Sequence, residues 1–180
     1  GYYDQYQYLP RAITCAENDV VVDVCLLHGT AHPALGAGED LEYVVGRLRE
    51  AWPGVRIHVR GDAGFGVPAM YAACERLDVH YTFGFSMNPR LKKISENTLK
   101  TAVERFEATG EPQRQFCQFW YKADSWPAQR WVVVKCEANT QGTNRRAVVT
   151  NRPGAPVLPE AAYDDYADRG ESENRNKELK

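Results

Sequence analysis

The sequence has no long hydrophobic run and no paired cysteine motif. None of its apolar stretches approaches the roughly 20 residues that a membrane-spanning helix needs. Its first residues do not resemble a basic segment followed by an apolar secretion signal. The cysteines are odd in number and scattered, without a C-x-x-C pair: Cys15, Cys25, Cys74, Cys117 and Cys136. Such a set favours buried thiols in a reducing compartment over disulfides or zinc, so we expect a cytoplasmic protein with no membrane partner.

Common ligand motifs are missing as well. The glycine-rich stretch around Asp62, G-D-A-G-F-G, matches neither G-x-x-x-x-G-K-[ST] nor G-x-G-x-x-G, which argues against a nucleotide loop. His28 and His32 have the i,i+4 spacing of a metal pair, but Pro33 and the neighbouring glycines argue against a helix that presents both rings together. No H-E-x-x-H glutamate lies between them. A zinc site at these histidines is therefore disfavoured.

What is present is a globular composition with a segregated charge. The 180 residues are 43 % hydrophobic and 26 % charged, which suits one sizeable core. Residues 85–152 carry twelve Lys and Arg against six Asp and Glu, whereas residues 1–84 carry six against eleven. A basic middle beside an acidic body suits a polyanion-binding surface next to a carboxylate-lined metal centre. Solvated surface strands would give similar counts.

Hydrophobic periodicity predicts an α/β protein with a mixed sheet. Alternating tyrosines predict a strand over Tyr2–Pro10, the apolar run Val20–Leu27 predicts a buried strand, and the turn between them predicts a hairpin. Further elements are expected at Glu39–Trp52 (helix), Val55–Arg60 (strand), Ala69–Leu77 (helix), Val79–Phe85 (strand), Ile94–Thr109 (helix), and Gln113–Lys122, Arg130–Asn139 and Arg145–Asn151 (strands). We divide the chain into the first part of a core (1–87), a basic β-rich insertion (88–157) and a final helix of the core (158–180).

Two polar sets stand out against this background. Asp62 follows the clearest strand directly, at a glycine-rich turn, which is where ligands bind in open α/β sheets; an ordinary Asp-Gly turn is the alternative. Near the C-terminus, Tyr166, Arg169, Glu173 and Lys180 fall within about 60° of one another on a helix. A solvated helix with internal ion pairs is the alternative there.

The spacing Tyr166-x2-Arg169-x3-Glu173-x6-Lys180 resembles the YREK signature of bacterial insertion-sequence transposases of the DDE type. The D-A-G-F sequence that begins at Asp62 is similar to the second-aspartate motif of that family, D-x-G-[FY]. The β-rich segment between the two motifs resembles the clade that has an inserted β-domain. The resemblance implies a ribonuclease-H-like fold, a mixed sheet flanked by helices with the insertion before the last helix.

The resemblance also implies roles. Asp62 and Glu173 would be catalytic carboxylates that bind two Mg²⁺ (or Mn²⁺) ions, while Tyr166, Arg169 and Lys180 would contact the transposon end. The partners would be double-stranded DNA, as transposon end and as target, and a second copy in a homodimer when the enzyme is intact. The enzyme would be located in the bacterial cytoplasm, in association with the nucleoid. The family's first catalytic aspartate has no counterpart here, so we expect a catalytic-core fragment that is inactive alone.

The basic insertion supplies further candidates. In relatives, a tryptophan of the β-insertion stacks on a flipped base, and Trp126 is our candidate for that contact. Packing of the small sheet is the favoured alternative for Trp126, and more so for Trp120 and Trp131. The cations expected to grip flanking DNA are Arg130, Arg145 and Arg146.

Two other functions fit the same residues. A ribonuclease-H-like nuclease would cut DNA without strand transfer. A decayed transposase remnant would bind DNA without catalysis, which the missing first aspartate favours.

Overall fold

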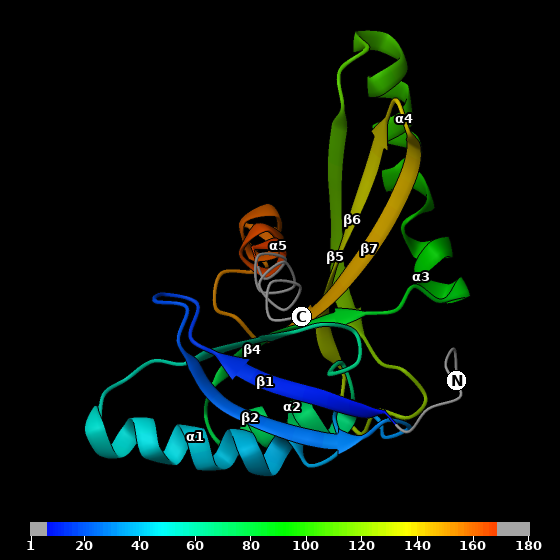
Figure 1. Cartoon of the computed structure of the whole chain (residues 1–180). Coiled ribbons are helices and arrows are strands. Elements are labelled where there is room, and N and C mark those ends of the chain that lie inside the picture. The colour runs from blue at the N-terminus through cyan, green and yellow to red at the C-terminus, as the bar shows by residue number, and fades with distance from the viewer. Residues whose placement is uncertain (1–6, 169–180) are drawn as a thin grey trace.

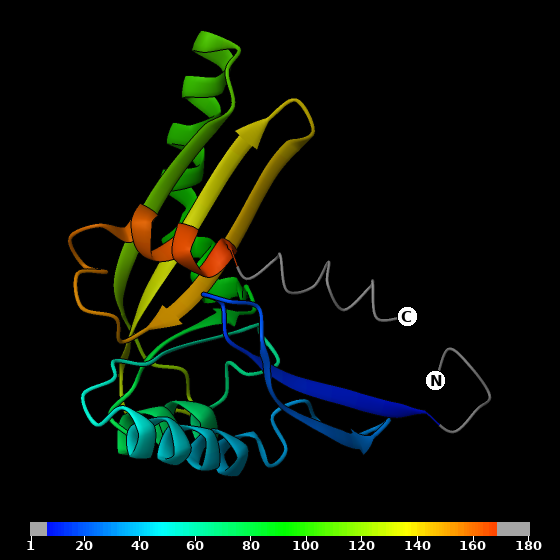
Figure 2. The same cartoon turned by 60° about the vertical axis from the view of Figure 1, so that its left-hand side comes forward.

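The structure is a computed structural model that describes residues 7–168, and these residues form two sheets and five helices (Figures 1 and 2). The first sheet is the antiparallel hairpin of β1 (Tyr8–Thr14) and β2 (Val21–His28). Asp19 in the connecting turn has φ 62°, a left-handed conformation that Asp tolerates better than most residues. The predicted hairpin is thus confirmed, but its first strand is Tyr8–Thr14 and not Tyr2–Pro10, of which residues 2–6 lie outside the described part of the chain.

The predicted burial of this hairpin is wrong. Val21, Val24 and Leu26 of β2 are 49 %, 55 % and 65 % exposed. Within residues 7–168 the hairpin pairs with no other strand, and it is fastened to the body through Arg11, which donates to the carbonyl of Pro33 and pairs with Asp40. The apolar sequence of β2 is compatible with burial, but it does not show that another element of the fold covers the strand.

The second sheet begins with a parallel pair. Strand β3 (His58–Gly61) pairs with β4 (His80–Phe85), and α2 (Pro68–Arg76) makes the crossover between them. Helix α1 (Ala37–Ala51) precedes β3 and ends where Trp52 and Pro53 interrupt it. These elements agree with those expected from the sequence, except that β3 is shorter than predicted.

Three antiparallel strands complete the same sheet. Strands β5 (Gln113–Tyr121), β6 (Arg130–Asn139) and β7 (Gly142–Thr150) follow the short helix α3 (Pro89–Ile94) and the helix α4 (Glu96–Thr109). The predicted three-stranded unit is present, but it does not form a separate sheet. Strand β7 pairs with β4, so the order is β3-β4-β7-β6-β5. The mixed α/β class is confirmed.

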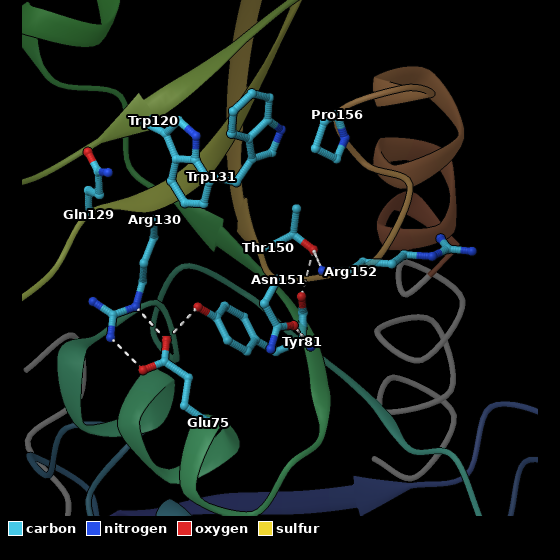
Figure 3. Close-up of a pocket in the computed structure, with 10 residues that line it drawn as sticks. All are labelled: Glu75, Tyr81, Trp120, Gln129, Arg130, Trp131, Thr150, Asn151, Arg152 and Pro156. Carbon is cyan, nitrogen blue, oxygen red and sulfur yellow. Dashed lines mark hydrogen bonds and ion pairs between the residues drawn. The ribbon is translucent and has the colours of Figure 1, made fainter.

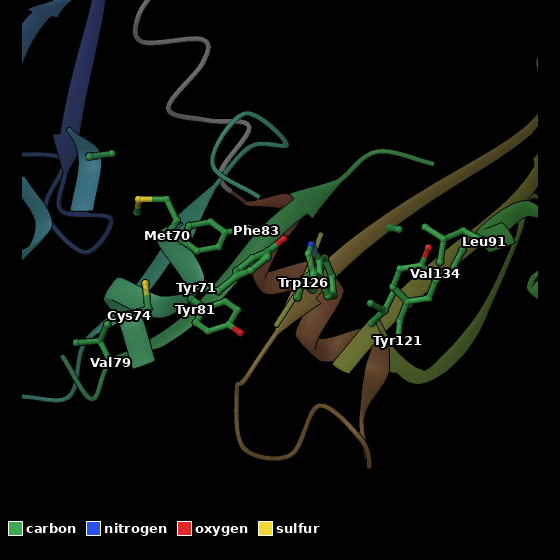
Figure 4. Close-up of a cluster of buried hydrophobic side chains, with 14 of the residues drawn as sticks. Met70, Tyr71, Cys74, Val79, Tyr81, Phe83, Leu91, Tyr121, Trp126 and Val134 are labelled. Atoms are coloured by element: carbon green, nitrogen blue, oxygen red, sulfur yellow. The ribbon is translucent and has the colours of Figure 1, made fainter. Parts of the chain in front are cut away.

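Helices lie on both faces of this five-stranded sheet. Helices α2, α3 and α4 cover one face, and α5 (Pro159–Ala167) crosses the other (Figure 2). The main core joins α1, α2 and β4 to the β5–β7 strands, and aromatic rings fill its centre (Figure 4). Tyr71 contacts Tyr81, Phe83 and Trp126, with ring centroids 5.5, 6.0 and 5.2 Å away. The core is therefore continuous across the boundary at residue 87 that separates the two parts in sequence.

Candidate catalytic and DNA-binding site

Asp62 lies at the surface, where β3 ends at the carboxyl edge of the parallel pair. Its Oδ1 accepts a hydrogen bond from the N–H of Gly64 at 2.8 Å, which closes a tight turn. Among residues 7–168, no group donates to its Oδ2. The turn thus fixes the carboxylate and leaves one oxygen open to solvent.

Tyr166, near the end of α5, lies beside this turn. A Cβ added at Gly84 of β4 would lie 2.6 Å from the Tyr166 hydroxyl oxygen and 2.7 Å from the nitrogen of Ala63. Both atoms therefore border the same small space, which is open only because Gly84 has no side chain. The fold brings together the turn of Asp62 and the first residue of the YREK-like spacing, which are 104 residues apart in the sequence.

A polar cluster attaches α5 to β3 next to this place. Asp165 accepts a hydrogen bond from Arg152 at 2.7 Å on Oδ2, and the same oxygen lies 3.2 Å from Nδ1 of His58. Arg60 donates to the backbone carbonyl of Asp165 and lies 3.8 Å from its Oδ1. Nε2 of His58 pairs with the hydroxyl of Thr82 at 2.9 Å. Sequence analysis missed this cluster, although the alternation of His58 and Arg60 in β3 shows that one face of that strand is polar.

The cluster sets the protonation of His58. Burial lowers the pKa of this imidazole, and the charges of Arg152 and Arg60 lower it further, while Asp165 opposes them. A neutral His58 therefore lies between two guanidinium groups and one carboxylate.

Comparison with known protein families matches the whole chain, residues 1–180, to "Transposase DDE domain group 1". The chain belongs to this transposase family. Searches of curated proteins and of solved structures found no match. A five-stranded mixed sheet between helices agrees with the ribonuclease-H-like fold of DDE transposases, so the fold class implied by the resemblance is confirmed. No helix within residues 7–168 is long and apolar enough to cross a membrane.

The carboxyl-terminal part of the transposase motif lies outside the described residues. This applies to Arg169, Glu173 and Lys180. The spatial relation of Glu173 to Asp62 is therefore still a prediction. Within the described chain, no group of three His, Cys, Asp or Glu side chains is arranged to hold a metal. Asp62 fits the role of one metal ligand, because it offers an open carboxylate oxygen of the kind that Mg²⁺ prefers.

The two histidines of the disfavoured zinc pair have local partners. Nδ1 of His28 lies 2.9 Å from the hydroxyl of Thr30, and Nδ1 of His32 accepts from the N–H of Ala34 at 3.2 Å. These hydrogen bonds lie within the loop that follows β2, and they do not direct the two imidazole rings toward each other.

Trp120 and Trp126 differ in burial from what the sequence analysis led us to expect. Trp126, the candidate for base stacking, is only 3 % exposed and packs edge-on against Tyr71 and Tyr121. Trp120, which we expected to pack more firmly, is 60 % exposed and touches Trp131 edge-on at 5.2 Å. These two indoles line a pocket of about 300 Å³ where β6 begins and β7 ends (Figure 3). The burial of Trp126 favours the packing alternative for that residue.

The three candidate arginines have different surroundings. Arg130 is 5 % exposed and forms two hydrogen bonds of 2.9 Å with Glu75 (Figure 3), and its guanidinium stacks over the ring of Tyr71. Arg145 donates to the carbonyl of Lys92 at 2.7 Å and so supports the end of α3. Arg146 is exposed on the opposite face of β7, the face that α5 crosses. Of the three, Arg146 is the one that solvent and a polyanion can reach freely.

Proposed function

We propose that the chain is the catalytic-core part of a cut-and-paste DDE transposase. The observation that supports this best is the position of Tyr166 beside the turn of Asp62, with both bordering the space above Gly84. A phenol hydroxyl beside the turn that carries an open carboxylate can position a DNA end at a metal-binding residue. In this proposal Asp62 and Glu173 bind the metal ions, and Tyr166, Arg169 and Lys180 hold the transposon end.

The reaction has two steps of the same kind. Hydrolysis breaks a phosphodiester P–O bond at the transposon end and frees a 3′-hydroxyl. That hydroxyl then attacks a phosphate of the target, so that one P–O bond forms while another breaks. Mg²⁺ or Mn²⁺, when bound, activates the attacking oxygen and stabilises the leaving oxygen. The carboxylates of the chain would hold the ions, and Tyr166, Arg169 and Lys180 would orient the DNA end.

The sheet supports the proposal that a strand bearing the first aspartate completes the core. Within residues 7–168, β1 pairs only with β2 and β3 pairs only with β4, so each keeps one open edge. An added strand would pair with these edges and bring a third carboxylate next to Asp62. Such pairing would also join the hairpin to the main sheet.

DNA is the partner that the family implies, and Arg146 is a cation through which the insertion can reach it. We also propose a homodimer of the intact transposase and a place on the nucleoid, because the substrate is chromosomal DNA. The chain by itself should bind Mg²⁺ or Mn²⁺ only weakly and should leave DNA intact.

A plasmid assay tests the proposal. The purified chain with Mg²⁺ should not nick supercoiled DNA, whereas the intact transposase should cleave the transposon end and join it to a target plasmid. Asp62→Asn in the intact enzyme should abolish both products. Cleavage without joined products would identify a nuclease. Nicking by the chain alone, abolished by Asp62→Asn, would show that another carboxylate of this chain completes the site.

A further inference from the structure

Helix α3 carries a cluster of exposed cations. Three of its six residues, Arg90, Lys92 and Lys93, are basic and exposed, and none of the six is acidic. The backbone of the exposed Lys122 lies beside them, because its carbonyl accepts a hydrogen bond of 3.4 Å from Arg90. We call these four residues the α3 patch. The patch belongs to the sheet face opposite to α5, so it is separate from Arg146.

Neighbouring acids do not neutralise the charges of the α3 patch. Among residues 7–168, no carboxylate pairs with any of its four cations. The exposed cations of α1 and α2 differ in this respect. Arg47 pairs with Glu50 at 2.8 Å. Arg76 pairs with Glu42, also at 2.8 Å. A group of cations without carboxylate partners attracts a polyanion more strongly than cations that are already paired.

The helix that presents the patch is held firmly at both ends. Asn88 caps its start: Oδ1 accepts the N–H of Leu91 at 2.9 Å, and Nδ2 donates to the hydroxyl of Tyr121 at 3.1 Å. The side chain of Leu91 is completely buried. Near the other end, Arg145 donates to the carbonyl of Lys92 at 2.7 Å. The cations therefore stand on a preorganised base, which lowers the entropic cost of binding a ligand.

The patch reaches the sheet edge that carries Asp62. Helix α3 follows β4 after residues 86–88, so it begins beyond the carboxyl edge of the parallel β3–β4 pair (Figure 1). Tyr166 borders the turn of Asp62 from the α5 side of the sheet, whereas the α3 patch lies on the opposite side. Six helical residues extend about 9 Å, which corresponds to two or three phosphates of one duplex strand at about 3.4 Å of axis each.

We infer that the α3 patch binds the phosphate backbone of the target duplex. This inference rests on the proposed function, in which the freed 3′-hydroxyl attacks a target phosphate at the metal-binding carboxylates. The target must come to the same edge as the transposon end, and two duplexes fit there when they approach from opposite faces of the sheet. Phosphate contacts carry no sequence information, so the patch positions the target and does not select it.

The salt dependence of DNA binding tests the contact with phosphates. The α3 variant, Lys92→Gln with Lys93→Gln, removes two unpaired charges, and the matched control, Arg47→Gln with Arg76→Gln, removes two paired ones. On random duplexes the α3 variant should flatten the logarithmic salt slope by about 2 and weaken binding at least tenfold at about 0.1 M salt. The control should stay close to the wild type. Lysines near the end of a helix also favour its dipole, so a loss of stability in urea with an unchanged salt slope would overturn the inference.

Separate assays of joining and hydrolysis with the intact transposase identify the duplex. Joining is measured with a transposon end that already has a free 3′-hydroxyl and with a target plasmid, and hydrolysis is measured with an uncleaved end. The α3 variant should lower joining at least about tenfold and keep hydrolysis within about twofold of the wild type. Lys92→Arg with Lys93→Arg keeps both charges and should restore joining. Equal losses of hydrolysis and joining would mean that the patch holds the donor DNA and not the target.

The result for Asp62→Asn distinguishes this inference from the proposed function. If Asp62→Asn abolishes joining while the α3 variant joins as well as the wild type does, the target-binding role is wrong and the proposed function stands. If the wild-type transposase joins no free 3′-hydroxyl end with Mg²⁺ or Mn²⁺, the proposed function is itself wrong and the target-binding role has no basis.

Discussion

Strands β2 and β6 have similar valine-rich sequences but opposite surroundings. In β2, Val21 and Val24 are about half exposed, whereas Val133 and Val134 in β6 are completely buried. Strand β6 has a partner on each side, and α4 and α5 lie on its two faces. Among residues 7–168, strand β2 pairs with one strand and leaves an apolar face exposed. The difference shows that the position of a strand in the sheet, and not its composition, decides how much it contributes to stability.

Truncation of one side chain in the five-stranded sheet and one in the hairpin should give the largest difference in stability. Phe83→Ala, in the buried strand β4, should lower the free energy of unfolding by about 3–5 kcal/mol, because it opens a cavity among packed rings. Leu26→Ala, in the exposed face of β2, should change it by less than about 0.5 kcal/mol. Urea unfolding followed by circular dichroism gives both values. Equal losses would mean that the hairpin is buried in solution.

Arg130 and Arg146, which both lie in the five-stranded sheet, should differ by a smaller amount in their contribution to stability. Arg130→Gln should cost about 2 kcal/mol of stability, because it removes the buried partner of the half-exposed Glu75. Arg146→Gln should leave stability unchanged and should flatten the salt dependence of DNA binding by about 1 in the logarithmic slope, if Arg146 contacts a phosphate. Binding to random duplexes at several salt concentrations, with unfolding of each variant, measures both effects. An unchanged slope would make Arg146 a solvated strand residue.

The smallest effect concerns pH. The folded pKa of His58 is lowered from its ordinary value near 6.5 by burial and by Arg152 and Arg60. The unfolded chain therefore binds this proton first as the pH falls below about 6.5, so stability should decrease with falling pH. His58→Gln should remove part of that slope between pH 7.5 and 5.5. A pH slope of stability that is unaffected by His58→Gln would contradict the prediction.

Much of the local structure could be predicted from the sequence. Alternation located β3, hydrophobic periodicity located α1 and α2, and the three strands between residues 113 and 151 were placed nearly correctly. The rule that ligands bind at strand ends selected Asp62. The contacts between segments that are distant in the sequence could not be predicted from it. The pairing of β7 with β4 depends on register between distant segments, which no local pattern encodes.

The tryptophans show that the burial of a single side chain is equally hard to predict from the sequence. Strand alternation indicates which residues share a face, but the cover on that face comes from elements far away in the chain. Trp126 is buried because Tyr71 of α2 and Tyr121 of β5 surround it, while Trp120 faces an open pocket. Asp165 was missed for a similar reason, since its partners come from β3 and from Arg152.

The junction between β4 and β7 has a consequence for the order of folding. Strands β6 and β7 are joined by a two-residue turn before Gly142 and can pair within microseconds, as local hairpins do. Pairing of Thr82 with Thr150 instead closes a segment of about 70 residues, and its entropic cost must be met before the contact contributes any stability. We therefore expect the insertion hairpin to form early and the union with β4 to limit the folding rate. The edge that carries Asp62 would then be assembled only in the final stage of folding.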